Sequence, residues 1–262
     1  MHVNFDPVFF YCFGYPIRWY ALAYIVGIFL GAHIAKKAAQ KLKIFDEKYI
    51  DLFINWIVIG IILGGRIGHV LFYDLEFFVN NPLEIIKVWN GGMSFHGGLI
   101  GVIISCILFC KKYPIKLLNL LDVLSLAAPI GLFFGRIANF VNGELYGKIW
   151  NSQFAFYFSD NLPRHPSQLY EAFSEGIVLF IAEYFAYKKM PYRDGALSGI
   201  FCVIYAISRI ICEIFREPDT GLNYIILSNT GLTIGQFLSI PLFCIGVFLI
   251  YKAMYSDTNS NI

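Results

Sequence analysis

The stretch LSLAAPIGLFFGRIANFVNGELYG, residues 124–147, decides the fold class, because it joins an apolar run to a group of polar side chains. Its first half has the composition of a segment embedded in lipid, whereas Arg136, Asn139, Asn142 and Glu144 follow within nine residues. A charge inside a membrane span costs at least about 2.5–3.5 kcal/mol on insertion scales, so it is usually paired or functional. We therefore expect a membrane-spanning helix that ends in a polar site.

The composition of the whole chain agrees with this expectation. The 262 residues are 58% hydrophobic and 15% charged, whereas soluble domains are about 45–50% apolar and about 25% charged. The apolar residues form blocks long enough to cross about 30 Å of hydrocarbon. We predict an all-α integral membrane protein, a single transmembrane domain over residues 1–262 with a small external head. The seven predicted spans lie near residues 19–37, 49–72, 93–110, 117–141, 168–187, 195–215 and 232–254.

Lysine and arginine are distributed unequally between the two sets of loops that seven spans create. Twelve of them lie in one set of loops and five in the other. The positive-inside rule places the richer set in the cytoplasm. We therefore expect the N-terminus outside and the C-terminus in the cytoplasm. The net charge of +2 is too small to indicate a nucleic-acid partner.

The three remaining arginines, Arg66, Arg136 and Arg209, all lie inside predicted spans. Helical residues rise by about 1.5 Å each, and successive spans run in opposite directions. On this reckoning the three arginines, Tyr20 and His96 all fall in the outer half of the bilayer. Independent spans are not expected to do this by chance, so we predict one polar site toward the outer leaflet.

The segment SRIICEIFREPD, residues 208–219, places Arg209, Glu213 and Arg216 at positions i, i+4 and i+7. These three side chains form one stripe on a helix. One interpretation is an ion pair within the helix that lowers the cost of insertion. Because two arginines flank a single glutamate, the alternative is that the surplus cation binds an anionic ligand.

The opening stretch also has two interpretations. Arg136 and Asn139 share a helix face, and Asn142-Gly143 is a turn signal that ends the helix. Capping, together with an arginine that snorkels to water, would explain Arg136. It would leave Asn139, Asn142 and Glu144 without a reason to cluster, which favours a binding site.

The segment GGMSFHGGLIG, residues 91–101, surrounds His96 with glycines. Glycines permit close backbone approach or irregular backbone, which at this depth needs a cavity or protein around it. A lone histidine is often a packing residue, but arginines at the same depth favour a proton-handling role. Residues 142–167 form the longest polar connection and are expected to be the external head, shaping a substrate entrance. For Asp122, a structural hydrogen-bonding role is at least as plausible as a functional one.

Six segments together resemble the bacterial prolipoprotein diacylglyceryl transferase family over nearly the whole chain. In the family's order they are IRWYALAY, GGRIGHVLFY, GGMSFHGGLIG, GRIANFVNGELYG, RHPSQLYE and SRIICEIFREPD. One such motif would be weak support, but six in order on matching spans are strong support. Ala138 and Tyr146 stand where the family often has glycine and tryptophan, and neither departure removes a charged signature residue.

The resemblance implies a reaction with two membrane-bound substrates. The diacylglyceryl group of phosphatidylglycerol moves to the lipobox cysteine of a preprolipoprotein, a thioether forms and glycerol phosphate leaves. This is the first step of bacterial lipoprotein maturation. The resemblance further implies no cofactor and no metal, a place in the bacterial cytoplasmic (inner) membrane, and an active site toward the outer leaflet.

The resemblance also assigns roles to the polar residues. Arg136 and Arg209 would hold the phosphate, because arginine grips phosphate oxygens bidentately. His96 is the candidate base for a thiol whose ordinary pKa is about 8.5, although the field of the arginines alone would also favour the thiolate. The predicted catalytic residues are His96, Arg136, Arg209 and Tyr20. The predicted substrate-binding residues are Gly91, Arg136, Asn139, Asn142, Glu144, Gly147, Arg209, Glu213 and Arg216.

Two other classes of membrane protein also use intramembrane polar residues. A transporter for an anion would explain the arginines and the glycine-rich segment, but no internal repeat is visible and the polar residues gather on one side. An intramembrane protease would need a serine–histidine pair, paired aspartates or a zinc motif. Ser94 lies two residues from His96 without a nucleophile elbow, and the five histidines show no metal-ligand spacing.

Overall fold

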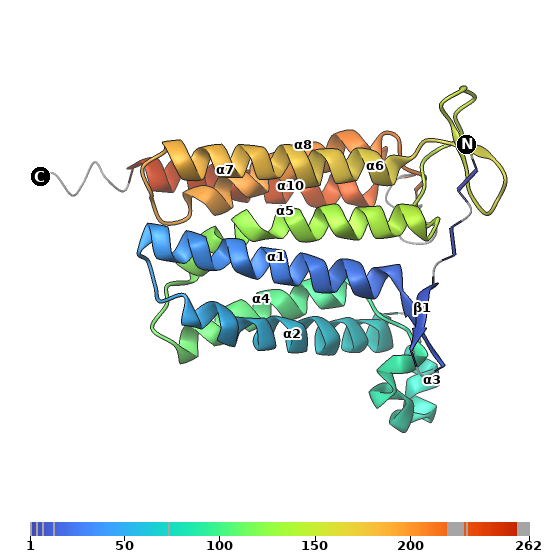
Figure 1. Ribbon diagram of the computed structural model, residues 1–262, viewed down its shortest axis with the longest axis horizontal. Coiled ribbons are helices and arrows are strands. Elements are labelled where there is room, and N and C mark those ends of the chain that lie inside the picture. Colours follow the sequence, from blue (N-terminus) through green and yellow to red (C-terminus); the bar gives the residue numbers. More distant parts are fainter. Residues whose placement is uncertain are drawn as a thin grey trace, which may run out of the picture. The chain divides into compact units, whose positions relative to one another are not determined.

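The computed structural model describes residues 2–3, 5–6, 8–12, 14–72, 74–218, 228 and 230–255. Within these residues helices dominate, and the strands form only two-stranded sheets, so the predicted all-α class is confirmed (Figure 1). The chain divides into two compact units. The first unit consists of Met1–Ala35 and Asp122–Ile262, and the second of Lys36–Leu121.

Five helices in the described part of the chain are long and apolar enough to cross a membrane. They are α1 (Trp19–Leu42), α2 (Lys48–Phe72), α5 (Leu117–Val141), α8 (Ala196–Glu213) and α10 (Ile234–Tyr255). Each coincides with a predicted span to within a few residues.

The other two predicted spans are also helical. One is α4 (Phe95–Lys112), whose 18 residues extend over about 27 Å at 1.5 Å per residue. The other is a continuous run of α6 (Ser167–Glu171), the π-helical segment η3 (Ala172–Val178) and α7 (Leu179–Lys189). That these two segments also cross the membrane stays a prediction.

The long helices have their apolar side chains outward and many of their polar side chains inward. Phe29, Ile59 and Phe248 expose 73%, 57% and 61% of their surface, whereas Glu171 and Glu175 expose none. A soluble protein would leave such an apolar surface in contact with water. The distribution fits helices that are surrounded by lipid, with their polar groups satisfied inside the bundle.

In the second unit, α2 and α4 pack against each other through glycines. A Cβ atom on Gly64 would lie 2.9 Å from the Cα of Gly101, and one on Gly68 would lie 2.7 Å from the Cα of Gly97. Small residues spaced four apart let two helix backbones approach closely in a membrane. The glycines after His96 therefore serve close helix packing. Three short helices connect the pair: α3 (Leu75–Asn80), η1 (Pro82–Ile86) and η2 (Val88–Asn90).

In the first unit, α5, α7, α8 and α10 run alongside one another (Figure 1). α8 and α10 meet closely, since a Cβ atom on Gly199 would lie 2.9 Å from the carbonyl oxygen of Gly246. The helix α1 approaches α5 in the same way, and a Cβ atom on Gly27 would lie 3.3 Å from the Cα of Gly131. These close crossings fix the helices that carry the polar residues of the site.

Asp122 is fully buried and organises the start of α8. Its carboxylate accepts hydrogen bonds from the backbone N–H groups of Gly195 at 2.7 Å and Ser198 at 2.8 Å, and from the Ser198 hydroxyl at 2.7 Å. The Tyr192 hydroxyl donates a fourth at 3.1 Å. These bonds satisfy donors that a helix N-terminus leaves without partners. Asp122 thus has the structural role that the sequence left open.

The head segment 142–167 is attached to the residues that follow α8. The backbone N–H of Gly147 donates to the carbonyl of His165 at 2.9 Å, and that of Lys148 donates to the carbonyl of Phe215 at 2.8 Å. A Cβ atom on Gly147 would lie 2.6 Å from both of those carbonyl oxygens, so only glycine fits there.

The described residues also contain four short strands: β1 (Val8–Cys12), β2 (Tyr15–Arg18), β3 (Phe156–Tyr157) and β4 (Pro163–Arg164).

Candidate active site

Three arginines and three glutamates form a buried cluster in the first unit, which we call the arginine–glutamate cluster. Its members come from α5, from the run of α6 and η3, and from α8 with the residues just after it. They are Arg136, Glu171, Glu175, Arg209, Glu213 and Arg216. The structure therefore brings together four residues that the sequence predicted, and adds Glu171 and Glu175.

Arg136 of α5 contacts two carboxylates through all three of its nitrogens. Its Nε and Nη2 donate to Oε2 of Glu175 at 3.1 and 2.9 Å. Its Nη1 lies 2.9 Å from Oε2 of Glu171. The guanidinium is thus held in a fixed plane between two acidic side chains that are one helical turn apart.

Glu171 is the centre of the cluster, because it contacts all three arginines. One oxygen, Oε1, accepts from Nη1 of Arg209 and from Nη1 of Arg216, the latter at 3.3 Å. The other oxygen faces Arg136. A fully buried carboxylate is stable only when such partners compensate for its lost hydration, and Glu171 has three.

Glu213 pairs with Arg209 at 2.8 Å along the same helix, as the i, i+4 spacing predicts. The helix α10 covers this pair, since a Cβ atom on Gly235 would lie 2.7 Å from Oε2 of Glu213. The intrahelical ion pair and the wider cluster are therefore both present. The ion pair within the helix, which is the first interpretation of the SRIICEIFREPD stripe, is thus present as part of the cluster.

The formal charges of the cluster balance. Three guanidinium groups face three carboxylates, and the arginine side chains expose 13%, 14% and 7% of their surface. The sequence led us to expect a surplus cation, because only Glu213 was counted against the arginines. Among the described members of the cluster that surplus is absent, since Glu171 and Glu175 supply the missing negative charges.

The two glutamates occupy an unusual stretch of helix. Glu171 ends α6, and Glu175 lies in the π-helical segment η3, where Gly176 lets the chain approach Phe133 of α5. A Cβ atom on Gly176 would lie 2.7 Å from the Cβ of Phe133. π-Helical turns are rare and occur often at functional sites. This one places a carboxylate against Arg136.

A second group of predicted residues lies around the end of α5. The Tyr20 hydroxyl donates to Oε2 of Glu144 at 2.9 Å. The backbone N–H of Glu144 donates to the carbonyl of Asn139 at 2.9 Å, which closes the end of the helix. Asn139 is buried, and Oδ1 of Asn142 is a buried acceptor without a partner among the described residues.

The remaining predicted residues belong to the second unit. Gly91 has a φ of 83°, which favours glycine, and its carbonyl accepts from Nη1 of Arg66 at 2.5 Å. Buried Arg66 also donates to the carbonyls of Glu84 and Ile85, so it fixes the loop before α4. The backbone of His96 lies in the first turn of α4, but its side chain is outside the described part of the structure.

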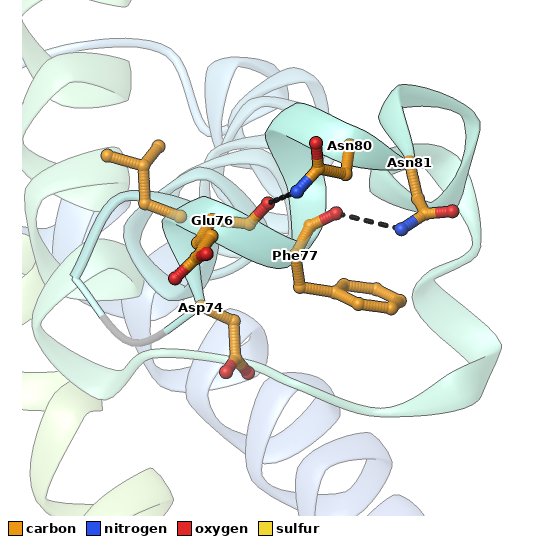
Figure 2. Close-up of a pocket in the computed structure, with 6 residues that line it drawn as sticks. Asp74, Glu76, Phe77, Asn80 and Asn81 are labelled. Carbon is orange, nitrogen blue, oxygen red and sulfur yellow. Dashed lines mark hydrogen bonds between the residues drawn. The ribbon is translucent and has the colours of Figure 1, made fainter.

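A pocket of about 460 Å³ lies on the short helix α3 (Figure 2). Within it, Nδ2 of Asn80 donates to the carbonyl of Glu76, and Nδ2 of Asn81 donates to the carbonyl of Phe77. The carboxylates of Asp74 and Glu76 would repel an anion. No member of the arginine–glutamate cluster lines this pocket, and it is not a candidate for binding phosphate.

His165 is a titratable residue of the head segment, outside the predicted spans. Burial and the nearby cation of Lys148 lower the pKa of His165 below its ordinary value of 6.5. The ring stacks on Trp150 with centroids 4.3 Å apart, and its Nδ1 lies 3.2 Å from the Tyr170 hydroxyl. Neutral imidazole therefore belongs to the folded head at pH 7.

The fold and the cluster define a helical membrane protein with a buried group of arginines and glutamates. Comparison with known proteins then supplies the family. The family model described as prolipoprotein diacylglyceryl transferase matches residues 7–252. The chain belongs to the prolipoprotein diacylglyceryl transferase family.

Close relatives agree over almost the full length. A protein named phosphatidylglycerol–prolipoprotein diacylglyceryl transferase from Rickettsia felis is 51% identical over 255 residues, which is 95% of this chain and 97% of the relative. Proteins of the same name from Rickettsia akari and Rickettsia canadensis are 49% and 50% identical over the same shares of both chains. The family predicted from the six sequence segments is therefore confirmed.

Proposed function

We propose that this protein transfers the diacylglyceryl group of phosphatidylglycerol to the lipobox cysteine of preprolipoproteins. The observation that carries the proposal is the arginine–glutamate cluster, inside a chain of this family. The cluster gathers three guanidinium groups among helices that span the membrane. A phosphodiester in an apolar cavity needs cations of this kind.

In this proposal Arg136 and Arg209 bind the phosphate of the lipid. As the bond between the diacylglyceryl carbon and the phosphate oxygen breaks, negative charge accumulates on the leaving glycerol phosphate. Two fixed guanidinium groups stabilise that charge more strongly than the charge of the ground state. Glu213 and Arg216 position Arg209, the first by its 2.8 Å ion pair and the second through their shared contact with Glu171.

The glycerol end of the headgroup offers hydroxyls, and residues around the end of α5 are proposed to bind them. Tyr20, paired with Glu144 at 2.9 Å, supplies an oriented hydroxyl. Asn139 and Asn142 supply amides, and the carboxamide oxygen of Asn142 is available for a donor. Gly91 and Gly147 are proposed to contribute backbone groups to the substrate-binding site.

The nucleophile is the thiol of the lipobox cysteine, which must lose its proton. His96 is the proposed base, because an imidazole titrates near neutral pH. The thiolate then attacks the diacylglyceryl carbon that is bonded to the phosphate oxygen. A C–S bond forms, and glycerol phosphate leaves. The proposed reaction uses no cofactor and no metal.

We place the protein in the bacterial cytoplasmic membrane as a multi-pass protein, with its N-terminus outside and its C-terminus in the cytoplasm. The support is the excess of lysine and arginine in one set of loops. The head segment 142–167 and the cluster then face the outer leaflet, where a lipid and a signal peptide both arrive.

A transfer assay with the purified protein tests the proposal. Phosphatidylglycerol vesicles and a synthetic lipobox peptide are supplied, and glycerol phosphate release is measured for the wild type and for Arg136→Ala and Arg209→Ala. We expect release that needs the peptide cysteine and falls by at least about 100-fold in each variant. A folded wild type that releases nothing, but conducts anions in proteoliposomes, would make the protein a transporter.

A further inference from the structure

Glu175 blocks the arginine that is proposed to hold the phosphate. Its Oε2 accepts from Nε and Nη2 of Arg136 at 3.1 and 2.9 Å, while Glu171 faces Nη1 at 2.9 Å. Every nitrogen of Arg136 already faces a carboxylate. A phosphate that binds in bidentate fashion through the Nε and Nη2 edge of Arg136 therefore has to displace Glu175.

The charge of the cluster sets a second condition. Its three arginines and three glutamates balance, and the glutamates expose 2% of their surface or less. A phosphodiester would add one negative charge to this buried site, and a buried charge without compensation is costly. One proton on a carboxylate removes that cost.

The contacts identify which carboxylate accepts the proton. Glu171 contacts three arginines, so a proton there would weaken three ion pairs. Glu213 occupies one nitrogen of Arg209 along their common helix. Glu175 occupies two nitrogens of Arg136, and its next arginine, Arg209, is 3.9 Å away. One proton on Glu175 therefore frees two nitrogens of Arg136 and leaves the contacts of Glu171 with all three arginines in place.

The second oxygen of Glu175, Oε1, is buried and has no hydrogen-bond partner within the described structure. It can therefore take up a proton without breaking a hydrogen bond. The charged and titratable groups around Glu175 are Arg136 from α5, Glu171 from α6, and Tyr205, Arg209 and Cys212 from α8.

From these contacts we infer that Glu175 is a catalytic proton carrier: it takes up a proton when the phosphate of the lipid replaces it at Arg136, and later gives that proton to the leaving phosphate. This inference rests on the proposed transferase function. It assigns a step to a residue outside the six segments on which the family resemblance was built.

The proton enters from solvent with the lipid. The thiol gives its own proton to the base, its sulfur forms the C–S bond, and the electrons of the broken C–O bond pass to the phosphate oxygen. That oxygen receives the proton of Glu175, and glycerol phosphate leaves as a monoanion. The Glu175 carboxylate then pairs with Arg136 again, which favours product release.

Lipid binding measured against pH tests the inference on the whole protein. For the wild type we expect the affinity for phosphatidylglycerol to fall by up to about tenfold per pH unit once free Glu175 is ionised, because binding takes up one proton. Diacylglycerol, which carries no phosphate, is the matched control lipid, and its binding should not change with pH. A wild type that binds phosphatidylglycerol without proton uptake would overturn the inference.

Three variants locate the proton. Glu175→Gln removes the negative charge and should bind phosphatidylglycerol more tightly, without the pH slope, while its turnover falls by at least about 100-fold. Glu175→Asp keeps the carboxylate and should keep the slope. If Glu175→Gln kept the slope and Glu213→Gln lost it, Glu213 would be the carrier and the inference would be wrong. A wild type that neither binds nor transfers the lipid would instead defeat the proposed function.

Discussion

Replacing Glu171 by glutamine tests how far the cluster depends on its central carboxylate. The change preserves size and shape but leaves three buried arginines facing two carboxylates. Oε1 of Glu171 lies against Arg209 and, at 3.3 Å, Arg216, and Oε2 lies 2.9 Å from Nη1 of Arg136. Removing one partner of a buried ion pair costs about 3–5 kcal/mol, so we expect a loss of that size in unfolding free energy.

In a thermal unfolding experiment in detergent this loss corresponds to a Tm lower by about 6–20 °C, at about 2–4 °C per kcal/mol. The same acid-to-amide change at Asp51, whose side chain is 58% exposed and pairs with Lys36 at 2.6 Å, is the matched control. Surface pairs contribute about 0–1 kcal/mol, so Asp51→Asn should unfold near the wild type.

A double variant separates charge balance from the loss of hydrogen bonds. Glu171→Gln with Arg216→Gln restores equal numbers of arginines and glutamates in the cluster. We expect it to be more stable than the sum of the two single variants predicts, by about 0.5–3 kcal/mol of coupling. The reasoning would be refuted if Glu171→Gln unfolded within about 1 kcal/mol of the wild type, or if the two changes were additive.

Four further variants probe three features away from the cluster. Asp122→Asn turns an amide N–H toward the donors at the start of α8, so its unfolding free energy should fall by about 1.5–3 kcal/mol, measured by the same thermal assay; an unchanged Tm would contradict the capping role. Gly101→Ala places a Cβ against the backbone of α2 and should cost about 1–3 kcal/mol or more, whereas Gly98→Ala, whose Cβ would meet its nearest atom at 3.7 Å, should cost little; equal costs would contradict the packing. His165 has a lowered pKa in the folded head, so the unfolded state binds the proton more tightly, and head stability should be full above pH 6.5 and fall as the pH drops through that range. The fluorescence of Trp150 reports this transition, and His165→Gln should abolish it; a transition that persists would assign it to another group.

The sequence predicted the helices well because their signal is local. An apolar block of about twenty residues can be recognised as a membrane-spanning helix without knowledge of the segments that pack against it. The pairing of Arg209 with Glu213 could be predicted for the same reason, because residues spaced four apart lie on the same face of a helix. The six family segments then connected these local signals to an activity.

Apart from Glu213, the partners of the arginines were not predicted, because they lie far away in the sequence. Arg136 meets Glu175 39 residues later. The acidic pair Glu171 and Glu175, spaced i, i+4 in an apolar span, was a visible signal that went unused. Had it been counted, the charge balance of the cluster would have been expected. Arg66 could not be interpreted from sequence, because its partners are backbone carbonyls, which any residue supplies.

The direct test of the account is the mass of a lipobox peptide after incubation with purified protein and phosphatidylglycerol. The account predicts a peptide heavier by one diacylglyceryl group, attached through a thioether at the cysteine, with one glycerol phosphate released for each modified peptide. It further predicts that Arg136→Ala and Arg209→Ala leave the peptide unmodified while remaining folded. An unmodified peptide with folded wild-type protein, or full modification by either variant, would contradict it.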